Sequence, residues 1–466
     1  MGIRSAPLAA HVTLAGTTVL HAFTHAYATM FGPLYLLMRD DLGLTQVSRV
    51  TLLVTLYGLV YWLMAFPAGY LADHVNRQRL LGWGLIGNAA CILAMGLTRR
   101  YELLVLLSVL AGLCGCVFHP AANALVPAHY PKAPGMAIGL LGIGSGLGFF
   151  AGPFYAGWSA RHSTFGGEWL SDWQRPFVEL GLLGLACGAA FLLLAREAPR
   201  PADDPGRGPP MPAWLRWRTL AHALAVSLRE YASVGVPVLT ALLLLKAYGY
   251  DTQRTGGMLG LAMLSAAVVN PLVVYFTAGT RRIPAHVTIL VLSALLTAAL
   301  PWFPGVWVLP ALMALMTLLL ASSAVGDAAL TERVAPNFRG RVNGLFLTIV
   351  GGTAATSPFV VGFGVDLLGE HASRSAAYVP LYAALAATTL LATISAWTLA
   401  RLEHRPGYSP DAGRAGTSSS GSGTQSSSSG KSDQYPDGRV AGDSITSHAE
   451  RASSTPTPTG RPAAAR

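Results

Sequence analysis

The sequence predicts an all-α membrane protein with twelve transmembrane helices in two related six-helix bundles. Hydrophobic residues make up 52% of the 466 residues and charged residues only 12%, whereas a soluble domain carries about 25% charged residues. So little charge cannot cover a water-facing surface of this size. In addition, residues 124–157 align without a gap with residues 329–362, and most identical pairs are Gly or Pro. A repeat this long indicates two similar halves rather than a solenoid.

Runs without charged residues mark the spans in order. They cover 5–38, 50–72, 80–98, 103–131, 133–160, 180–195, 231–245, 255–280, 283–326, 342–365 and 375–400. A helix needs about 20 apolar residues to cross a bilayer, so the run 283–326 is long enough for two spans, with a turn at residues 301–305. The total is twelve. The runs lack the alternation of a transmembrane β-barrel, which leaves helices.

These spans define four regions. We expect an N-terminal bundle over residues 1–196, a cytoplasmic central loop over 197–218, a C-terminal bundle over 219–402 and a disordered cytoplasmic tail over 403–466, which is rich in Ser, Gly and Pro. The first run is too long for a signal-peptide core. Lys and Arg are more frequent in alternate loops, which predicts cytoplasmic termini in a bacterial inner membrane. The net charge of +10 is then a consequence of topology and does not indicate nucleic-acid binding.

Small residues at helical spacing mark the fifth span. A face without side chains lets a neighbouring helix pack backbone to backbone, and a proline in the helix interior bends it. A tight helix interface without a further role is the alternative. The residues expected to matter for gating are Gly139, Gly148, Gly152, Pro153 and Gly157.

A second motif, residues 69–79, begins with Gly69 and ends the second span. Asp73 would sit at a cytoplasmic helix end, where it can face Arg77 or the positive N-terminus of another helix and hold the inner side shut. The alternative is a charge cluster that only fixes topology, which suits Arg79 better than Asp73. The repeat equivalent of Asp73 is Ala278, so the inner gates of the two halves should differ.

With these motifs the chain resembles the major facilitator superfamily over residues 10–402. The motif at 139–157 is similar to that of proton-driven exporters in this family. Two positions depart from the usual pattern: Asn76 stands in place of a Gly, and Ala156 replaces the first Gly of the closing pair. A narrower resemblance, to the fosmidomycin-resistance exporters, rests on residues 21–27, 118–120 and 228–229.

Titratable residues inside spans are the main functional candidates, because each is costly in lipid without a partner. His21 and His25 lie one turn apart on the same face of the first span, and histidine exchanges a proton near neutral pH. The alternative is a core histidine bonded to a neighbouring backbone. His119 precedes Pro120, which frees a carbonyl, so it suits a structural role as well as a functional one.

Arg229 and Glu230 form the most informative pair. The charge-free stretch after them, residues 231–245, is too short to cross a bilayer, so the helix must carry both charges into the membrane. The repeat places Arg229 opposite His25, and substrates of such transporters bind between the halves near the midplane. The alternative is that both side chains reach back to the interface.

The predicted function is proton-coupled export of a small molecule by alternating access. His21 and His25 would face Arg229 and Glu230 across a cavity, and Arg229 would attract an anionic group, which fits the phosphonate substrate that the narrower resemblance implies. An uptake symporter for an organic anion and a metal transporter using His21, His25 and His119 are the alternatives. We expect a monomer without cofactor, resident metal or nucleic-acid partner. An enzyme is disfavoured, since no phosphate-binding Gly-rich loop occurs.

Overall fold

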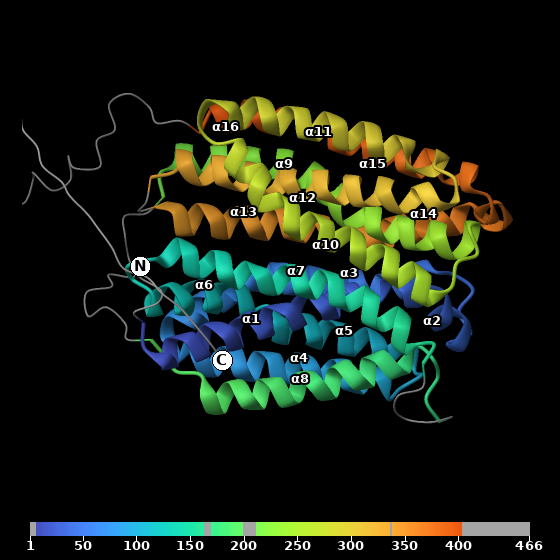
Figure 1. Cartoon of the computed structure of the whole chain (residues 1–466), viewed down its shortest axis with the longest axis horizontal. Helices are drawn as coiled ribbons and strands as arrows, with labels where there is room; N and C mark the ends of the chain where they lie inside the picture. The colour runs from blue at the N-terminus through green and yellow to red at the C-terminus, as the bar shows by residue number, and fades with distance from the viewer. Residues whose placement is uncertain (1–5, 163–168, 199–210, 336–337, 403–466) are drawn as a thin grey trace, which may run out of the picture. The chain divides into compact units, whose positions relative to one another are not determined.

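The computed structural model describes residues 6–162, 169–198, 211–335 and 338–402. Every regular element in these ranges is helical (Figure 1), which confirms the predicted fold class. The first-half helices lie together, as do those of the second half. We call the end at which the first helix begins and the last one finishes the proximal end, and the opposite end the distal end. The predicted tail and most of the predicted central loop fall outside the described residues.

The first half contains six membrane-spanning elements. The first helix is followed by a short 3₁₀ turn, η1 (Gly32–Leu34), and by α2 (Tyr35–Asp41). The fourth span is divided into two helices, and Pro120 lies in the first turn after the break. The spanning helices are α1 (Leu8–Thr29), α3 (Ser48–His74), α4 (Arg77–Gly96), α5 (Tyr101–Gly115) with α6 (Phe118–His129), α7 (Pro134–Ser159) and α8 (Gln174–Leu194).

The second half repeats this arrangement. The last two spans of this half, the eleventh and twelfth of the chain, are each divided into two helices. Pro358 lies in the first turn after the break between α13 and α14. The spanning elements are α9 (Ala213–Leu242) with a π-helical turn η3 (Leu243–Ala247), α10 (Thr252–Phe276), α11 (Arg282–Ala299), α12 (Val308–Arg333), α13 (Arg339–Ala354) with α14 (Ser357–Leu367), and α15 (Val379–Leu391) with α16 (Ile394–Ala400). Short 3₁₀ turns lie at Gly279–Arg281, Leu300–Trp302, Gly305–Trp307, Gly369–Ser373 and Ser375–Tyr378.

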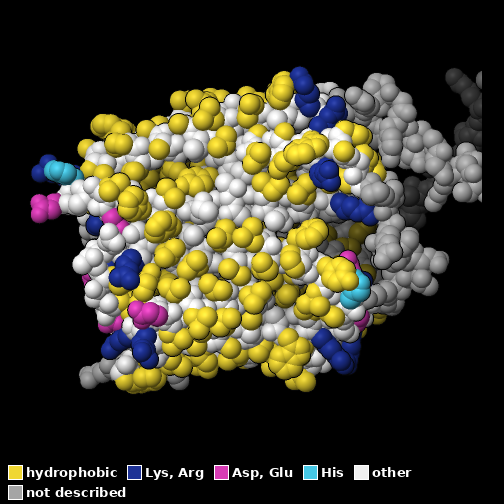
Figure 2. Space-filling model, turned by 180° about the vertical axis from the view of Figure 1, so that it is seen from behind, with side chains coloured by type: hydrophobic (Ala, Val, Ile, Leu, Met, Phe, Trp, Pro, Cys, Tyr) yellow, Lys and Arg dark blue, Asp and Glu magenta, His cyan; other side chains and the backbone are white. Residues whose placement is uncertain are grey.

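Eleven helical segments are long and apolar enough to cross a membrane. The first predicted span, α1, is not among these eleven, because five threonines and three histidines lower its hydropathy. The surface agrees with a membrane location, because apolar side chains cover the middle of the face in Figure 2 and charged side chains gather toward its two ends. Such a continuous apolar surface is far larger than the patches on soluble monomers.

Glycines bring α7 into backbone contact with α1, the helix that carries two of the candidate histidines. A Cβ at Gly144 would overlap the carbonyl oxygen of Thr18, and one at Gly148 would overlap that of Ala22. Gly152 meets α1 in the same way. The small-residue face of the fifth span is therefore an α1 interface, and it fixes the position of α1 relative to α7.

The two halves meet closely at the distal end and separate toward the proximal end. Near the distal end, Gly157 of α7 and Gly256 of α10 lie backbone to backbone, and Gly362 of α14 lies against Ser48 and Thr51 of α3. Nearer the proximal end, a Cβ at Gly139 or at Gly344 would have no atom within 4 Å. The structure is thus a conformation that is closed at its distal end.

Candidate functional site

The three predicted histidines of the first half lie together. His21 Nδ1 donates a hydrogen bond to the carbonyl oxygen of Leu141 at 2.9 Å, and the Nε2 atoms of His21 and His25 are 3.1 Å apart. Since Nδ1 of a neutral His21 carries the proton, its Nε2 accepts from Nε2–H of His25. The remaining lone pair of a neutral His25 is then on Nδ1.

His119 completes this cluster from α6. Ring nitrogens of the three histidines lie within 4.8 Å of one another, a spacing from which imidazoles could approach a common ligand or ion. Trp62 of α3 stacks on His119 with ring centroids 5.6 Å apart and planes 12° apart. Phe118 stacks on His21 at 4.7 Å. These neighbouring rings restrict the orientation of the imidazoles.

Arg229 and Glu230 lie within the second half, on the long helix α9. Arg229 Nη2 is 3.0 Å from Glu230 Oε2, and a second guanidinium nitrogen, Nη1, donates to the Ser323 hydroxyl of α12. Ser323 Oγ donates in turn to Glu230 Oε2 at 3.3 Å. The Arg229 side chain is only 4% exposed, whereas that of Glu230 is 28% exposed. The guanidinium is therefore enclosed in protein, and the carboxylate faces open space.

That space is a cavity of about 300 Å³ between the halves. His25 and His119 line it from the first half, and Glu230 and Ser323 line it from the second. His21 stands behind His25, and Arg229 is not among the lining residues. The structure thus brings His25, His119 and Glu230 to one cavity, with His21 and Arg229 each bonded to a lining residue.

Polar contacts between the halves lie at the distal end. The two carboxylate oxygens of Asp366, near the end of α14, accept hydrogen bonds from the backbone N–H groups of Val47 and Ser48 at 2.9 Å each. These N–H groups belong to the start of α3, so a carboxylate of one half caps a helix of the other. Arg161 and Asp251 form an ion pair across the same end.

At the proximal end the predicted gating motif is anchored within the first half. Arg77 Nη1 donates to the carbonyl of Ala124 at 3.1 Å, and its Nε lies 4.0 Å from Glu197 Oε1. The Asn76 side chain accepts from the backbone N–H of Arg79 at 2.8 Å. Asn76, a departure from the usual family pattern, is therefore the N-cap of α4.

The exposed members of that motif lie on either side of the loop between α3 and α4. Asp73, the second-last residue of α3, is exposed, as is Arg79 in the first turn of α4. Gly69 faces Pro120 of α6, with 3.7 Å between its ideal Cβ and the proline Cβ. Gly69 thus lies at an α3–α6 contact, and Asp73 lies in the last turn of α3.

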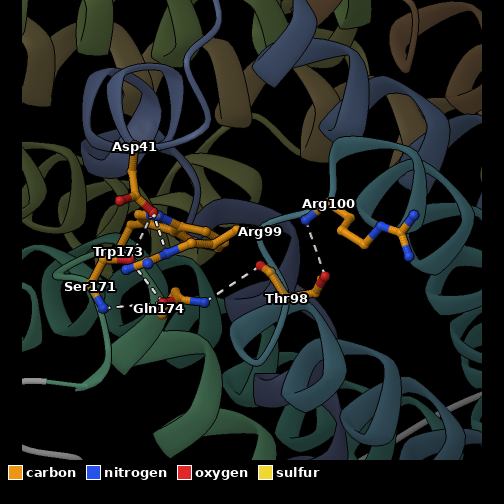
Figure 3. Close-up of polar contacts among 7 residues, drawn as sticks. All are labelled: Asp41, Thr98, Arg99, Arg100, Ser171, Trp173 and Gln174. Atoms are coloured by element: carbon orange, nitrogen blue, oxygen red, sulfur yellow. Dashed lines mark hydrogen bonds and ion pairs between the residues drawn. The ribbon is translucent and has the colours of Figure 1, made fainter.

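A polar cluster at the distal end of the first half was not predicted (Figure 3). Asp41 accepts from Trp173 Nε1 at 2.8 Å and from the Ser171 hydroxyl at 2.9 Å, and Arg99 Nε is 3.1 Å from the same carboxylate. Gln174 Nε2 donates to the Thr98 carbonyl at 3.4 Å. These contacts join the end of α2, the loop before α5 and the start of α8, so they stabilise the first half as one body.

Comparison with known proteins identifies the family. The model of the Major Facilitator Superfamily matches residues 17–276, more than half of the chain. The chain belongs to this superfamily. It is therefore a multi-pass membrane protein of a transporter family.

Curated relatives match over part of their length. The chain is 29% identical over 171 residues to the probable actinorhodin transporter of Streptomyces coelicolor, covering 36% of this chain and 29% of that protein. It is 28% identical over 149 residues to the puromycin resistance protein pur8 of Streptomyces alboniger, covering 32% of this chain and 29% of that protein. These matches span less than a third of each relative.

Solved structures match over almost the whole described region. A bacterial homolog of the human lysosomal transporter Spinster, inward-facing and unoccupied, has a TM-score of 0.69 at 18% identity, covering 86% of this chain and all of that chain. The nucleoside transporter NupG has a TM-score of 0.63 at 12% identity, covering 85% and 99%. At these identities the likeness shows the fold alone.

Proposed function

We propose that this chain is a proton-coupled exporter of a small molecule that works by alternating access. The observation that carries the proposal is the cavity between the halves, which has histidines on one side and a carboxylate on the other. Membrane-embedded titratable groups at a substrate cavity are the usual elements of proton coupling. The relatives named for actinorhodin transport and puromycin resistance support export as the direction.

Orientation follows from the Lys and Arg bias in the sequence. With cytoplasmic termini in a bacterial inner membrane, the proximal end faces the cytoplasm, and the closed distal end faces outward. A substrate would then enter from the cytoplasm in the present conformation. Closing the proximal end and parting Asp366 from the start of α3 would expose the same cavity to the outside.

The proton has two acceptors in this arrangement. Glu230 can take a proton on its cavity-facing carboxylate, and a neutral His25 can take one on Nδ1, since its Nε2 donates to His21. Either event adds one positive charge to the cavity wall. It therefore weakens the binding of a substrate that prefers the deprotonated wall. Protonation from outside would thus release the substrate, and deprotonation toward the cytoplasm would reset the site.

Proteoliposomes with an imposed pH gradient test this proposal, with puromycin as the first transported probe. We expect gradient-driven transport to be lost in Glu230→Gln and strongly reduced in His25→Ala, while gradient-independent exchange of the probe persists in at least one of them. Glu370→Gln, on the exposed distal surface, is the matched control. Gradient-driven transport at the wild-type rate in both cavity variants would remove the proposed coupling.

Two alternatives are distinguished by separate measurements. An uptake symporter for an organic anion has the same fold, and deletion would then create a growth requirement instead of drug sensitivity. The proximity of His21, His25 and His119 also suits imidazole coordination of a divalent metal. Saturable stabilisation of the purified protein by Zn²⁺, lost in His119→Ala, would favour metal transport.

A further inference from the structure

Arg229, the cation bonded to the lining residue Glu230, is withdrawn from the cavity. Arg229 has one guanidinium nitrogen on Glu230 and another on Ser323, and 4% of its side chain is exposed. No Lys or Arg is among the described residues that line the cavity. An anionic group in the cavity would therefore meet the carboxylate of Glu230 before it could reach the guanidinium. This geometry does not support the anionic substrate that the sequence suggested.

The second half instead presents a negative pole. Glu230 is the lining residue with a formal charge, and its carboxylate also accepts from Ser323 of α12. Because the Arg229 guanidinium is enclosed and the Glu230 carboxylate is partly exposed, the side of this pair that faces the cavity is its negative side.

The first half supplies a wall of aromatic rings. Tyr57, Tyr61 and Trp62 come from one stretch of α3, and Phe149 of α7 packs on His25 with centroids 4.2 Å apart. Tyr61 and Trp62 meet edge to face at 5.2 Å. The opposite wall is aliphatic apart from Glu230 and two serines. Tyr57 and Tyr61 are buried, so Trp62 and Phe149 provide the accessible ring surface. A flat ring can pack on that surface, and a cation is attracted by aromatic faces.

We propose that the cavity binds planar aromatic molecules that carry a basic or permanently charged nitrogen. The ring packs on Trp62 and Phe149, and the cationic nitrogen pairs with Glu230. This assignment deepens the proposed function, because it names the substrate class of the same cavity. A cation and a proton then compete for Glu230, which gives exchange of one for the other.

Binding to the purified full-length protein in detergent tests the assignment. Aminoacridine, a planar three-ring cation at neutral pH, and anthracenecarboxylate, a planar anion of the same size, form a matched pair for titration calorimetry. We expect the cation to bind at least about tenfold more tightly, the effect of one charge-assisted hydrogen bond. Equal binding, or tighter binding of the anion, would overturn the proposal.

Variants separate the two elements of the site. Glu230→Gln should remove the preference for the cation, and Trp62→Leu should weaken both probes while leaving the preference. Glu332→Gln, an acid outside the cavity lining, should change neither. Thermal unfolding of each variant shows whether it folds, and if Glu230→Gln does not fold, Glu230→Asp, which retains the charge, must keep the cation preference.

Acidification should weaken aminoacridine binding, since protons compete for Glu230. The charged and titratable groups around that carboxylate and its cavity are Arg229, Asp327, His25 and His119, so the comparison with Glu230→Gln isolates its share. Binding in detergent needs no gradient. If the wild-type protein shows gradient-driven transport but no preference for the cation, only this inference is overturned. If it prefers the cation but its transport does not depend on the gradient, only the proposed function is overturned.

Discussion

Replacing Asp366 by Asn should open the distal end. The carboxylate accepts one hydrogen bond on each oxygen, from Val47 N–H and Ser48 N–H, and both donors belong to the opposite half. An asparagine side chain keeps one acceptor oxygen and turns an NH₂ group toward the second donor. It also removes the negative charge from the start of α3, where a helix favours one.

The expected size of this change follows from those two bonds. A hydrogen bond to a charged group contributes about 1.5–3 kcal/mol, and a charge at a helix N-terminus contributes about 0.3–1 kcal/mol. Asp366 is partly exposed, so solvent screening reduces both figures. A net loss of about 1.5 kcal/mol would shift the equilibrium between distally closed and distally open states by roughly tenfold.

Distance measurements between spin labels across the distal end report this equilibrium. Labels at the exposed positions Thr45 and Glu370 would be introduced after replacement of the native cysteines. Asp366→Asn should increase the population with a long distance, whereas the control Asp172→Asn, whose partner Arg175 lies in the same half, should leave it unchanged. An unchanged distribution in Asp366→Asn would refute the role assigned to this contact.

Two stability predictions follow from the packing of the first half. Gly148→Ala should lower the melting temperature measured by fluorescence-detected chromatography, since the new methyl group would overlap the Ala22 carbonyl, whereas Gly139→Ala, with no atom within 4 Å, should be tolerated; equal melting temperatures would contradict this difference. Tyr27→Phe should destabilise the protein by about 1 kcal/mol, because the fully buried hydroxyl donates to the Leu180 carbonyl at 3.0 Å. An unchanged melting temperature would show that this bond makes no net contribution.

The fold could be predicted from the sequence because the constraint that lipid imposes is local. A span must be about 20 residues long and must bond its own backbone, so each run without charge marks a helix. The breaks inside spans were not predicted, and Pro358 is the one signal that could have indicated the break before α14. The first span was recognised from its freedom from charge, although its histidines and threonines give it a lower hydropathy than the others.

The site could be predicted in part, for a different reason. A polar group in lipid is conspicuous in a sequence, which is why His25, His119 and Glu230 were selected. Which way Arg229 points was not accessible, because its direction is decided by Ser323, a residue 94 positions away. The aromatic wall was also missed. The spacing of Tyr57 and Tyr61, one turn apart on α3, was the available signal, but aromatic residues are common in any apolar span.

An acid near a helix C-terminus occurs both at the closed distal end and in the motif at the proximal end. Asp366 and Asp73 both lie near a helix C-terminus, where a negative charge is unfavourable unless it has a partner. Asp366 obtains one from the start of α3 in the present state. Asp73 lies at the other end of that same α3, and the second-half helix α13, which contacts α3, begins at Arg339.

If the halves closed at the proximal end, Asp73 could approach the start of α13 as Asp366 now approaches the start of α3. Closure at each end would then join an acid near a helix C-terminus to the start of a helix of the opposite half. A transporter needs both states to be populated, so a closure of about the same strength at each end is more useful than a strong closure at one.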